Sequence, residues 1–345
     1  MRIAQIAPLQ VAVPPMAYGG TERVVAELTD TLVQRGHDVT LFASGDSQTR
    51  ARLVSYVPTA LGFDPATEVL ATHLGLLTAV FRRADEFEVI HSHLEHLTLP
   101  FVRWTRTPTV LTFHNRLDKP AAARLLESYP DAHYVSISDS QRAAVPTLRW
   151  AATVYHGVQV QSFPFSAEPG SYLVFLGRIS PEKRPDRAIA IAKRAGVPLK
   201  IVGKIDAKDR TYFEQAVEPH LHDARIEFVE SVDEGRKREL LRGAAALLLP
   251  IDWPEPFGMV FIEALACGTP VLTCPCGAAP ELLADGVTGY LRASDEDLVA
   301  AVPALAKIDR AGCRRYAQRR FDTGIMAESY LRVYQSLLTS EPQRA

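Results

Sequence analysis

The 345-residue chain has little that would suggest a membrane, secreted or nucleic-acid-binding protein. No apolar run approaches the roughly 20 residues that a transmembrane helix needs. The first residues, MRIAQIAPLQ, have a short strand pattern without the apolar core of a signal peptide. The formal net charge is only −2 and the sequence pI about 6.6, so nucleic acid is not expected as a partner. We therefore expect a cytoplasmic protein without a transmembrane segment, and leave open its contact with a membrane surface.

Cysteine is scarce, with four residues in the chain. Cys274 and Cys276 have one residue between them, whereas paired zinc ligands usually have two to four, and no second pair follows. Cys267 and Cys313 stand alone. We expect all four to be small and mostly buried side chains in a reducing compartment, not disulfides or metal ligands.

The composition is that of an ordinary globular protein, with 47% hydrophobic and 23% charged residues. At a typical size of about 150 residues, the length suggests two domains. Strand patterns alternate with helical patterns through the first half and again from Tyr172 onward, which predicts parallel sheets covered by helices on both faces. Between the two series, residues 161–170 (QSFPFSAEPG) carry two prolines and a glycine, so we assign the linker there.

We expect the following elements. In the first half, strands are predicted at 2–7, 38–43, 54–57, 89–92, 109–112, 133–136 and 153–155, with a helix at 21–35 capped by Thr21. In the second half, strands are predicted at 172–177, 199–202, 226–229, 245–249, 270–273 and 289–291. Helices are predicted there at 185–194, 209–219, 233–242, 257–267, 296–305, 311–321 and 325–338.

One strand and the helix after it carry the most informative residues. Residues 245–249 form an uninterrupted apolar run, which predicts a buried parallel strand. Three prolines then end regular structure, and an apolar helical pattern follows from about Phe257 until Gly268. The helix thus begins beyond the carboxyl end of a strand, where open α/β sheets bind their ligands.

The start of this helix offers groups that suit a phosphorylated sugar. Backbone N–H groups at Phe257, Gly258 and Met259 would lack helical acceptors, and the positive end of the helix dipole favours an anion there. Glu255 and Glu263, with seven residues between them, offer carboxylates to sugar hydroxyls. The alternative is a surface loop with a solvated glutamate, and these residues alone do not decide between the two.

A basic cluster follows the first strand of the second half. Arg178 stands just past that strand, and the turn at 180–182 can bring Lys183 to the same side. An arginine and a lysine fixed at a strand end suit a diphosphate. Positive charge at the start of a helix opposes the helix dipole, so an anionic partner is expected. The alternative is an ordinary basic helix start.

Gly19 and Gly20 separate the first strand from the first helix. Consecutive glycines before a helix can cradle a phosphate, and a flexible turn is an equal alternative. The pair is not the G-x-G-x-x-G of a dinucleotide-binding fold, and no predicted strand is followed by that motif. A Rossmann oxidoreductase is therefore not expected.

Histidines cluster after two strands of the first half. His91, His93 and His96 lie in VIHSHLEHL, and His114 follows the strand at 109–112. Close histidines raise the possibility of a metal site. Loop histidines or hydrogen-bonded core histidines are the commoner outcome, and we expect no metal. His114 is singled out because it stands at the carboxyl end of a strand.

Together these segments resemble glycosyltransferase family 4, whose members are retaining enzymes with the GT-B fold. The resemblance extends nearly from end to end and includes YGGTERVV, RGHDVTLFA, VIHSH, TFHN, VSISDSQR, GRISPEK, PEPFGMVFIEALACGTPV and GAAPELLADGVTGYL. Its most specific part is the pair Arg178-x4-Lys183 and Glu255-x7-Glu263. The family usually has Asn-Gly before the linker, where this chain has His156 and a glycine, so the role of that position is open.

The resemblance implies an α/β protein of the GT-B fold, with two doubly wound Rossmann-like domains that face each other across a cleft. We expect an acceptor-side domain at 1–163 and a domain that binds the nucleotide sugar at 171–322. A helix follows at 323–345, with the option that it packs back towards the first domain.

The resemblance also implies roles for single residues. Arg178 and Lys183 would hold the diphosphate and Glu263 the ribose, while Glu255 and the helix amides would hold the donor sugar. The implied catalytic residues are His114, Arg178, Lys183 and Glu255. The implied donor-binding residues are Gly19, Gly20, Arg178, Lys183, Phe257, Gly258, Met259 and Glu263.

The implied function is retaining, metal-independent transfer of a hexose from a nucleotide-diphosphate sugar to an acceptor hydroxyl, with UDP-glucose favoured as donor. No Asp-x-Asp stands directly at the end of a predicted strand to bridge a metal and a diphosphate, and no cofactor is expected. The sequence does not identify the acceptor, which is a sugar, a lipid-linked compound or a small molecule. The alternatives are a nucleotide-sugar 2-epimerase of the same fold and a non-catalytic nucleotide-sugar-binding protein.

Overall fold

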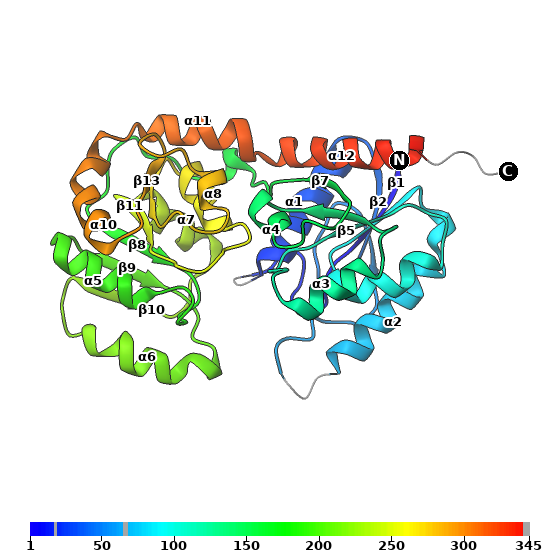
Figure 1. Cartoon of the computed structure of the whole chain (residues 1–345), viewed down its shortest axis with the longest axis horizontal. Helices are drawn as coiled ribbons and strands as arrows, with labels where there is room; N and C mark the ends of the chain where they lie inside the picture. The colour runs from blue at the N-terminus through cyan, green and yellow to red at the C-terminus, as the bar shows by residue number, and fades with distance from the viewer. Residues whose placement is uncertain (17–18, 65–67, 341–345) are drawn as a thin grey trace. The chain divides into compact units, whose positions relative to one another are not determined.

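The computed structural model describes residues 1–16, 19–64 and 68–340. The chain forms two compact units (Figure 1). The first comprises Met1–Val158 together with Thr323–Ala345, and the second comprises Gln159–Asp322. The C-terminal helix is thus part of the same unit as the first half of the chain. No helix in the described ranges is long and apolar enough to cross a membrane.

Within the described residues, the first unit is built on a parallel sheet in the order β3-β2-β1-β4-β5-β6-β7. The strands are β1 (Arg2–Ile6), β2 (Asp38–Ala43), β3 (Arg52–Ser55), β4 (Val89–Ser92), β5 (Thr109–Thr112), β6 (His133–Ser136) and β7 (Trp150–Thr153). Every residue of β4 and β5 is buried, as expected for strands that are covered on both faces. The register places Ile6 opposite both Phe42 and Ser92, so the carboxyl ends of β1, β2 and β4 meet at one edge.

Helices of the first unit cover this sheet. They are α1 (Gly20–Gln34), α2 (Val69–Phe81), α3 (Pro120–Glu127), α4 (Asp139–Ala143) and α12 (Thr323–Ser340), with 3-10 turns η1 (Ala84–Glu86) and η2 (Glu95–Arg103). α12 packs against α1, although about 290 residues separate them in the chain. Arg35 closes this contact by donating to the carbonyl oxygen of Gly324 at 2.7 Å.

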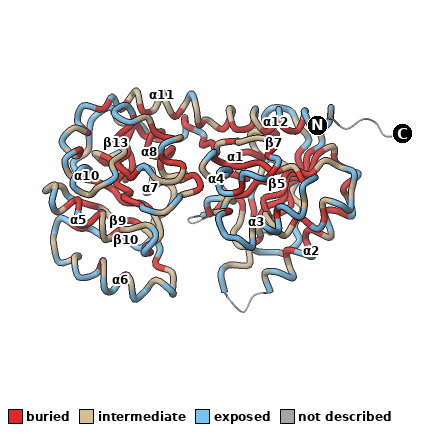
Figure 2. Tube along the Cα trace, viewed as in Figure 1, coloured by how far each residue is buried: buried red, intermediate tan, exposed pale blue. Residues whose placement is uncertain are grey.

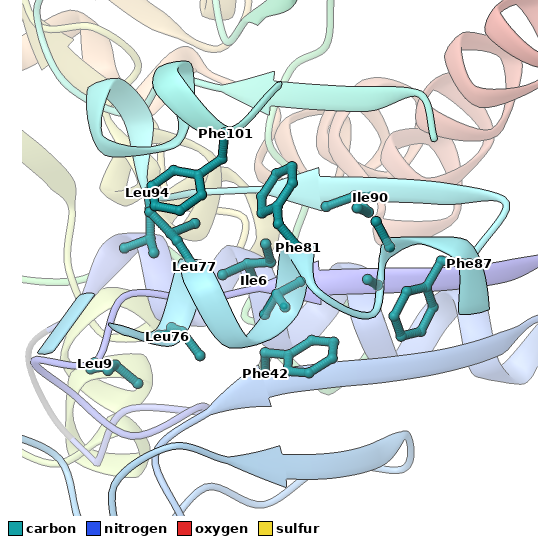
Figure 3. Packing of buried hydrophobic residues seen from close by; sticks show 13 residues of the cluster. Ile6, Leu9, Phe42, Leu76, Leu77, Phe81, Phe87, Ile90, Leu94 and Phe101 are labelled. Carbon is teal, nitrogen blue, oxygen red and sulfur yellow. The ribbon is translucent and has the colours of Figure 1, made fainter. Parts of the chain in front are cut away.

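An apolar cluster fixes α2 on the sheet of the first unit (Figure 3). Ile6, Phe42, Leu77 and Phe81 are at most 5% exposed, and Phe81 packs on the ring of Phe101 at 5.5 Å between centroids. Full burial of each such side chain stabilises a fold by about 1.5–3 kcal/mol. The cluster therefore holds β1, β2 and β4 firmly, and β4 carries His91 and is followed directly by His93, both discussed below.

The second unit repeats the architecture on its own parallel sheet, in the order β10-β9-β8-β11-β12-β13 over the described residues. The strands are β8 (Leu173–Leu176), β9 (Leu199–Val202), β10 (Ile226–Val229), β11 (Ala246–Leu249), β12 (Val271–Thr273) and β13 (Gly289–Leu291). The helices are α5 (Pro185–Ala195), α6 (Arg210–Ala216), α7 (Glu234–Arg242), α8 (Met259–Ala266), α9 (Ala279–Leu282), α10 (Asp295–Ala301) and α11 (Arg310–Phe321), and the 3-10 turns are η3 (Val160–Ser162), η4 (Ala207–Asp209), η5 (Glu218–His220) and η6 (Val302–Lys307). Figure 2 shows buried residues along the strands of each sheet.

Several expected boundaries differ from the structure, four of them as follows. Thr21 does not cap α1, which starts at Gly20 after Gly19, a residue whose φ of 146° suits glycine. α8 starts at Met259, two residues later than expected, because Gly258 turns the chain with a φ of 92°. β3 and β7 lie two to three residues earlier than the strands predicted at 54–57 and 153–155. Both are edge strands, where few apolar residues mark the boundaries.

Candidate functional site

The carboxyl edge of the second sheet gathers the residues that the sequence singles out there. Arg178 follows β8, and Glu255 follows β11. β8 and β11 are hydrogen-bonded neighbours in the sheet, so their following loops lie side by side. Lys183 donates to the Oε2 atom of Glu255, and its ammonium also lies 4.6 Å from the ring centre of Trp253. The structure thus brings together Lys183 and Glu255, which are 72 positions apart in the chain.

Arg178 lies at the same edge and is 21% exposed. Its guanidinium contacts Glu182 at 3.2 Å and Asp206 at 3.7 Å. Both carboxylates are partly open to solvent, and such pairs contribute little net stability, so a stronger anion can displace them. A diphosphate is an anion of that kind.

The other basic residues of this segment have partners within the unit. Arg184 contacts Asp252 at 2.6 Å and Asp186 at 3.1 Å, and Arg187 contacts Asp295 at 2.6 Å. Asp186 also lies in the first turn of α5, where it offsets the basic charge at the helix start. The alternative of an ordinary basic helix start thus describes Arg184 and Arg187, whose anionic partners are carboxylates of the same unit. Arg178 and Lys183 are left as the candidates for a ligand.

Gly258 shapes the start of α8. A Cβ atom at this position would lie 2.7 Å from the ring of Phe261, and the φ of 92° is unfavourable for other residues. Helix starts leave amides without helical acceptors, and those of Gly258 and Met259 have no hydrogen-bond acceptor among the described residues. The loop thus presents main-chain donors and a helix terminus beside Glu255, which approaches the Gly258 Cβ position to 3.5 Å through its Cγ atom.

Glu263 is placed differently from Glu255. It lies inside α8, is 3% exposed, and accepts a hydrogen bond of 2.8 Å from Lys237 on α7. Lys237 also contacts Glu234 at 2.9 Å. Lys237 is a residue that sequence reasoning missed, since α7 carries several basic residues and nothing in their spacing marks this one. A ribose at Glu263 would have to compete with Lys237 for the carboxylate.

In the first unit, Gly19 and Gly20 form the entrance to α1. A Cβ atom on Gly19 would lie 2.8 Å from Pro15 and 3.0 Å from an Oε2 oxygen of Glu22, so only glycine fits. Glu22 is 6% exposed, and burial raises the pKa of its carboxyl to about 7. Sequence reasoning missed Glu22, because a glutamate in the first turn of a helix is an ordinary stabilising feature.

His114 follows β5 and forms part of a cluster of imidazoles. Its Nε2 lies 2.9 Å from Nδ1 of His93, and its ring stacks on that of His156 at 5.1 Å between centroids. Burial lowers the pKa of His114 to about 3 and keeps the pKa of His91, His93 and His156 well below the usual value. All four rings are therefore neutral near pH 7.

No group of histidine, cysteine or acidic residues suited to a metal ion occurs in the described part of the chain. His91 and His93 form hydrogen bonds with Gln5, Thr112, His114 and Tyr334. The interpretation of hydrogen-bonded core histidines is thus the one that holds for His91 and His93. The four cysteines are free, and all except Cys276 are buried.

Comparison with known proteins finds similar glycosyltransferases. The model of glycosyl transferases group 1 matches residues 161–320, and that of glycosyltransferase family 4 matches residues 18–162. Phosphatidyl-myo-inositol mannosyltransferase of Mycobacterium leprae is 28% identical over 99% of this chain and 98% of its own. Glycogen synthase of Mycobacterium tuberculosis is 25% identical over 96% of this chain and 94% of its own.

Solved structures share the fold at lower identity. AviGT4, a glycosyltransferase involved in avilamycin A biosynthesis, superimposes with a TM-score of 0.80 at 24% identity, covering 99% of this chain and 98% of its own. HepE of Anabaena, in complex with UDP and glucose, superimposes with a TM-score of 0.76 at 18% identity, covering 97% of this chain and all of its own. The architecture is the GT-B fold with two Rossmann-like domains. The chain is a glycosyltransferase and belongs to glycosyltransferase family 4.

Proposed function

We propose that the protein transfers a hexose from a nucleotide-diphosphate sugar to an acceptor hydroxyl, with retention of the anomeric configuration and without a metal. The observation that carries the proposal is the meeting of Arg178, the Lys183–Glu255 pair and the glycine-shaped start of α8 at one edge of the second sheet. A uridine nucleotide with glucose is the favoured donor, supported by the fold similarity to HepE, whose structure contains UDP and glucose.

The Lys183–Glu255 pair supplies the two kinds of group that such a donor needs. On donor binding, Lys183 would turn its charge to the diphosphate and release Glu255 to the sugar hydroxyls. A charge-assisted hydrogen bond contributes about 1.5–3 kcal/mol, whereas a helix terminus typically contributes about 0.3–1 kcal/mol. Arg178 and Lys183 would therefore stabilise the departing diphosphate more than the α8 dipole does.

The same pair bears on the stereochemical course. In the proposed complex Glu255 accepts hydrogen bonds from the sugar hydroxyls, so it does not serve as the nucleophile that would form a glycosyl-enzyme bond. His114 uses one ring nitrogen for His93 and lies in a neutral cluster. In the proposed step the acceptor oxygen bonds to the anomeric carbon from the side that the diphosphate leaves, and a phosphate oxygen takes the acceptor proton.

Metal independence is part of the proposal, and the fixed cations support it. The Asp-x-Asp sequence of this chain lies at Asp295–Asp297 in the first turn of α10. Asp295 pairs with Arg187, and Asp297 contacts the hydroxyl of Ser294 at 2.7 Å. These carboxylates are therefore engaged, and Arg178 with Lys183 would provide the positive charge that a metal provides elsewhere.

Thermal shift measurement against a panel of nucleotide sugars tests the donor. A ligand at about 100 times its Kd adds about 2.7 kcal/mol of stability, which gives a clear shift. Transfer to a mixed acceptor panel, with and without a chelator, then tests activity and metal dependence, and proton NMR of the product gives the anomeric configuration. Release of an epimerised sugar nucleotide without an acceptor would indicate the 2-epimerase, and absence of even slow donor hydrolysis would indicate a binding protein. An inverted product or a glycosyl adduct on Glu255 would contradict the proposed course.

A further inference from the structure

A continuous chain of hydrogen bonds runs through the core of the first unit from His114 to the C-terminal helix. His114 Nε2 meets His93 Nδ1 at 2.9 Å, and His93 Nε2 meets Gln5 Oε1 at 3.0 Å. Gln5 Nε2 lies 3.3 Å from the hydroxyl of Tyr334 on α12. His93, Gln5 and Tyr334 are at most 1% exposed, so water does not substitute for any of these contacts.

The amide of Gln5 sets the direction of the hydrogen bonds between Gln5 and His114. Its Oε1 atom only accepts, so His93 must donate from Nε2. A neutral His93 then has a lone pair on Nδ1, and His114 must donate to it from Nε2. A neutral His114 consequently has its own lone pair on Nδ1. That atom is buried and has no hydrogen-bond partner among the described residues.

The hydrogen bonds on the other side of Gln5, towards Tyr334 and His91, fix the orientation of its amide. Because Gln5 Nε2 donates to the oxygen of Tyr334, that hydroxyl is free to donate to His91 Nδ1 at 2.7 Å. His91 Nε2 then donates to the hydroxyl of Thr112 at 2.8 Å, which meets the hydroxyl of Tyr330 at 3.0 Å. Every donor faces an acceptor along this path. A reversed Gln5 amide would reverse each bond and would leave a proton, not a lone pair, on His114 Nδ1.

We propose that Gln5, His93 and Tyr334 are positioning residues that hold His114 as its Nε2–H tautomer, so that Nδ1 is presented to a ligand hydroxyl as a hydrogen-bond acceptor. This inference rests on the proposed function for the identity of the ligand, but the tautomer itself does not depend on it. The low pKa of His114 is consistent with the arrangement, since protonation would add a proton at Nδ1, which is buried and has no hydrogen-bond partner among the described residues. α12 thereby contributes to the site through Tyr334.

The phenylalanine variants of two tyrosines on the same helix separate this role from packing. Tyr330 and Tyr334 are both fully buried on α12 and their rings stack at 6.1 Å between centroids. Tyr334→Phe removes the acceptor that orients Gln5, whereas Tyr330→Phe removes a hydroxyl beyond Thr112 and leaves Gln5 its partner. Both keep the ring, so loss of packing is matched.

The experiment measures ring-nitrogen chemical shifts of His114 in the 15N-labelled full chain at pH 7, assigned with a His114→Asn sample. The wild type and Tyr330→Phe should show Nε2 protonated and Nδ1 unprotonated. Tyr334→Phe should show averaging with the second tautomer and a donor KM raised about twofold at equal populations, and more if the second tautomer dominates, with the acceptor KM unchanged. A backbone amide spectrum checks that each variant is folded.

Two results would overturn the inference. One is protonated Nδ1 of His114 in the wild type, and the other is a single unchanged tautomer in Tyr334→Phe. If Tyr334→Phe does not fold, Gln5→Glu takes its place: the carboxylate still accepts from His93 but no longer donates to Tyr334, so His114 should keep its tautomer, and a change there would count against the inference. Failure of the wild type to transfer any sugar would reject the proposed function while the chemical shifts still decide the tautomer.

Discussion

The candidate site residues at the carboxyl edges of the two sheets are polar groups of different kinds. In the first unit, the hydrogen-bond chain that begins at the His114 ring consists of neutral imidazoles, an amide and hydroxyls, while the backbone N–H of His114 donates to the carboxylate of Glu95 at 2.9 Å. In the second unit, Arg178 and Lys183 are joined to carboxylates. Breaking a buried neutral bond leaves an unsatisfied group at about 1–3 kcal/mol, whereas partly exposed ion pairs exchange partners at little net cost. The first unit thus offers fixed geometry and the second offers exchangeable charge.

The largest effect should follow from removing an exchangeable charge. Arg178→Ala should lower kcat by roughly 10²–10³, the scale for loss of one preorganised donor that stabilises developing charge. Steady-state kinetics with saturating donor measure it. Arg184→Ala is the matched control, since Arg184 is held by Asp186 and Asp252 and should be close to wild type. Equal losses in both variants would show that Arg178 acts only through local structure.

Glu22 is a buried carboxyl group in the first unit, so it tests what a charge costs in that unit. Its pKa in the folded protein is raised from 4.5 to about 7, so the folded state binds the proton more tightly than the unfolded state. No penalty exists below pH 4.5, it grows as the pH rises between 4.5 and 7, and it is complete above 7. At about 1.4 kcal/mol per pKa unit, the penalty is on the order of 3 kcal/mol.

Glu22→Gln imitates the protonated carboxyl and should remove that penalty. The variant should therefore unfold at a higher temperature than the wild type at pH 8, and at a similar temperature at pH 4. Thermal unfolding followed by circular dichroism at both values measures the difference. A gain of equal size at both pH values would show that the charge of Glu22 is not its cause.

The sequence predicted the parallel sheets and the residues at their edges because continuous apolar runs and strand-end positions are local signals. It also indicated loop or hydrogen-bonded core histidines as the commoner outcome, and His91 and His93 are hydrogen-bonded in the core. It did not predict Lys237 beside Glu263, Asp252 beside Arg184, or Tyr334 beside Gln5, which is 329 positions away. Such pairs depend on which helices pack together, and the spacing of residues within one helix does not indicate its packing partner.

Tyr18 lies outside the described residues, so the glycine segment YGG is only partly placed.

Glu263 should show a smaller effect, confined to binding. Glu263→Ala should raise the donor Kd by about tenfold or more, as expected for a charge-assisted hydrogen bond of about 1.5–3 kcal/mol, with little change in kcat. Isothermal titration with the nucleoside diphosphate measures it. Glu234→Ala is the control, because it removes the other carboxylate beside Lys237 and leaves Glu263 in place. Equal donor affinities in wild type and Glu263→Ala would rule out the ribose role.

Ionic strength should have the smallest effect. It should change the donor affinity, which depends on the second unit, and leave the His114 tautomer of the first unit unchanged. The Debye length falls from about 10 Å at 0.1 M salt to about 3 Å at 1 M, which weakens attraction between partly exposed charges. Donor affinity, which depends on Arg178 and Lys183 leaving their carboxylates for a diphosphate, should therefore fall several-fold over that range. Arg178→Ala should show a shallower dependence, since one of the responding charges is gone. The tautomer of His114 should not change with salt, because the hydrogen-bond chain that fixes its ring consists of groups without net charge. Salt-independent donor binding would show that the ion pairs of the second unit are structural and are not exchanged for the ligand.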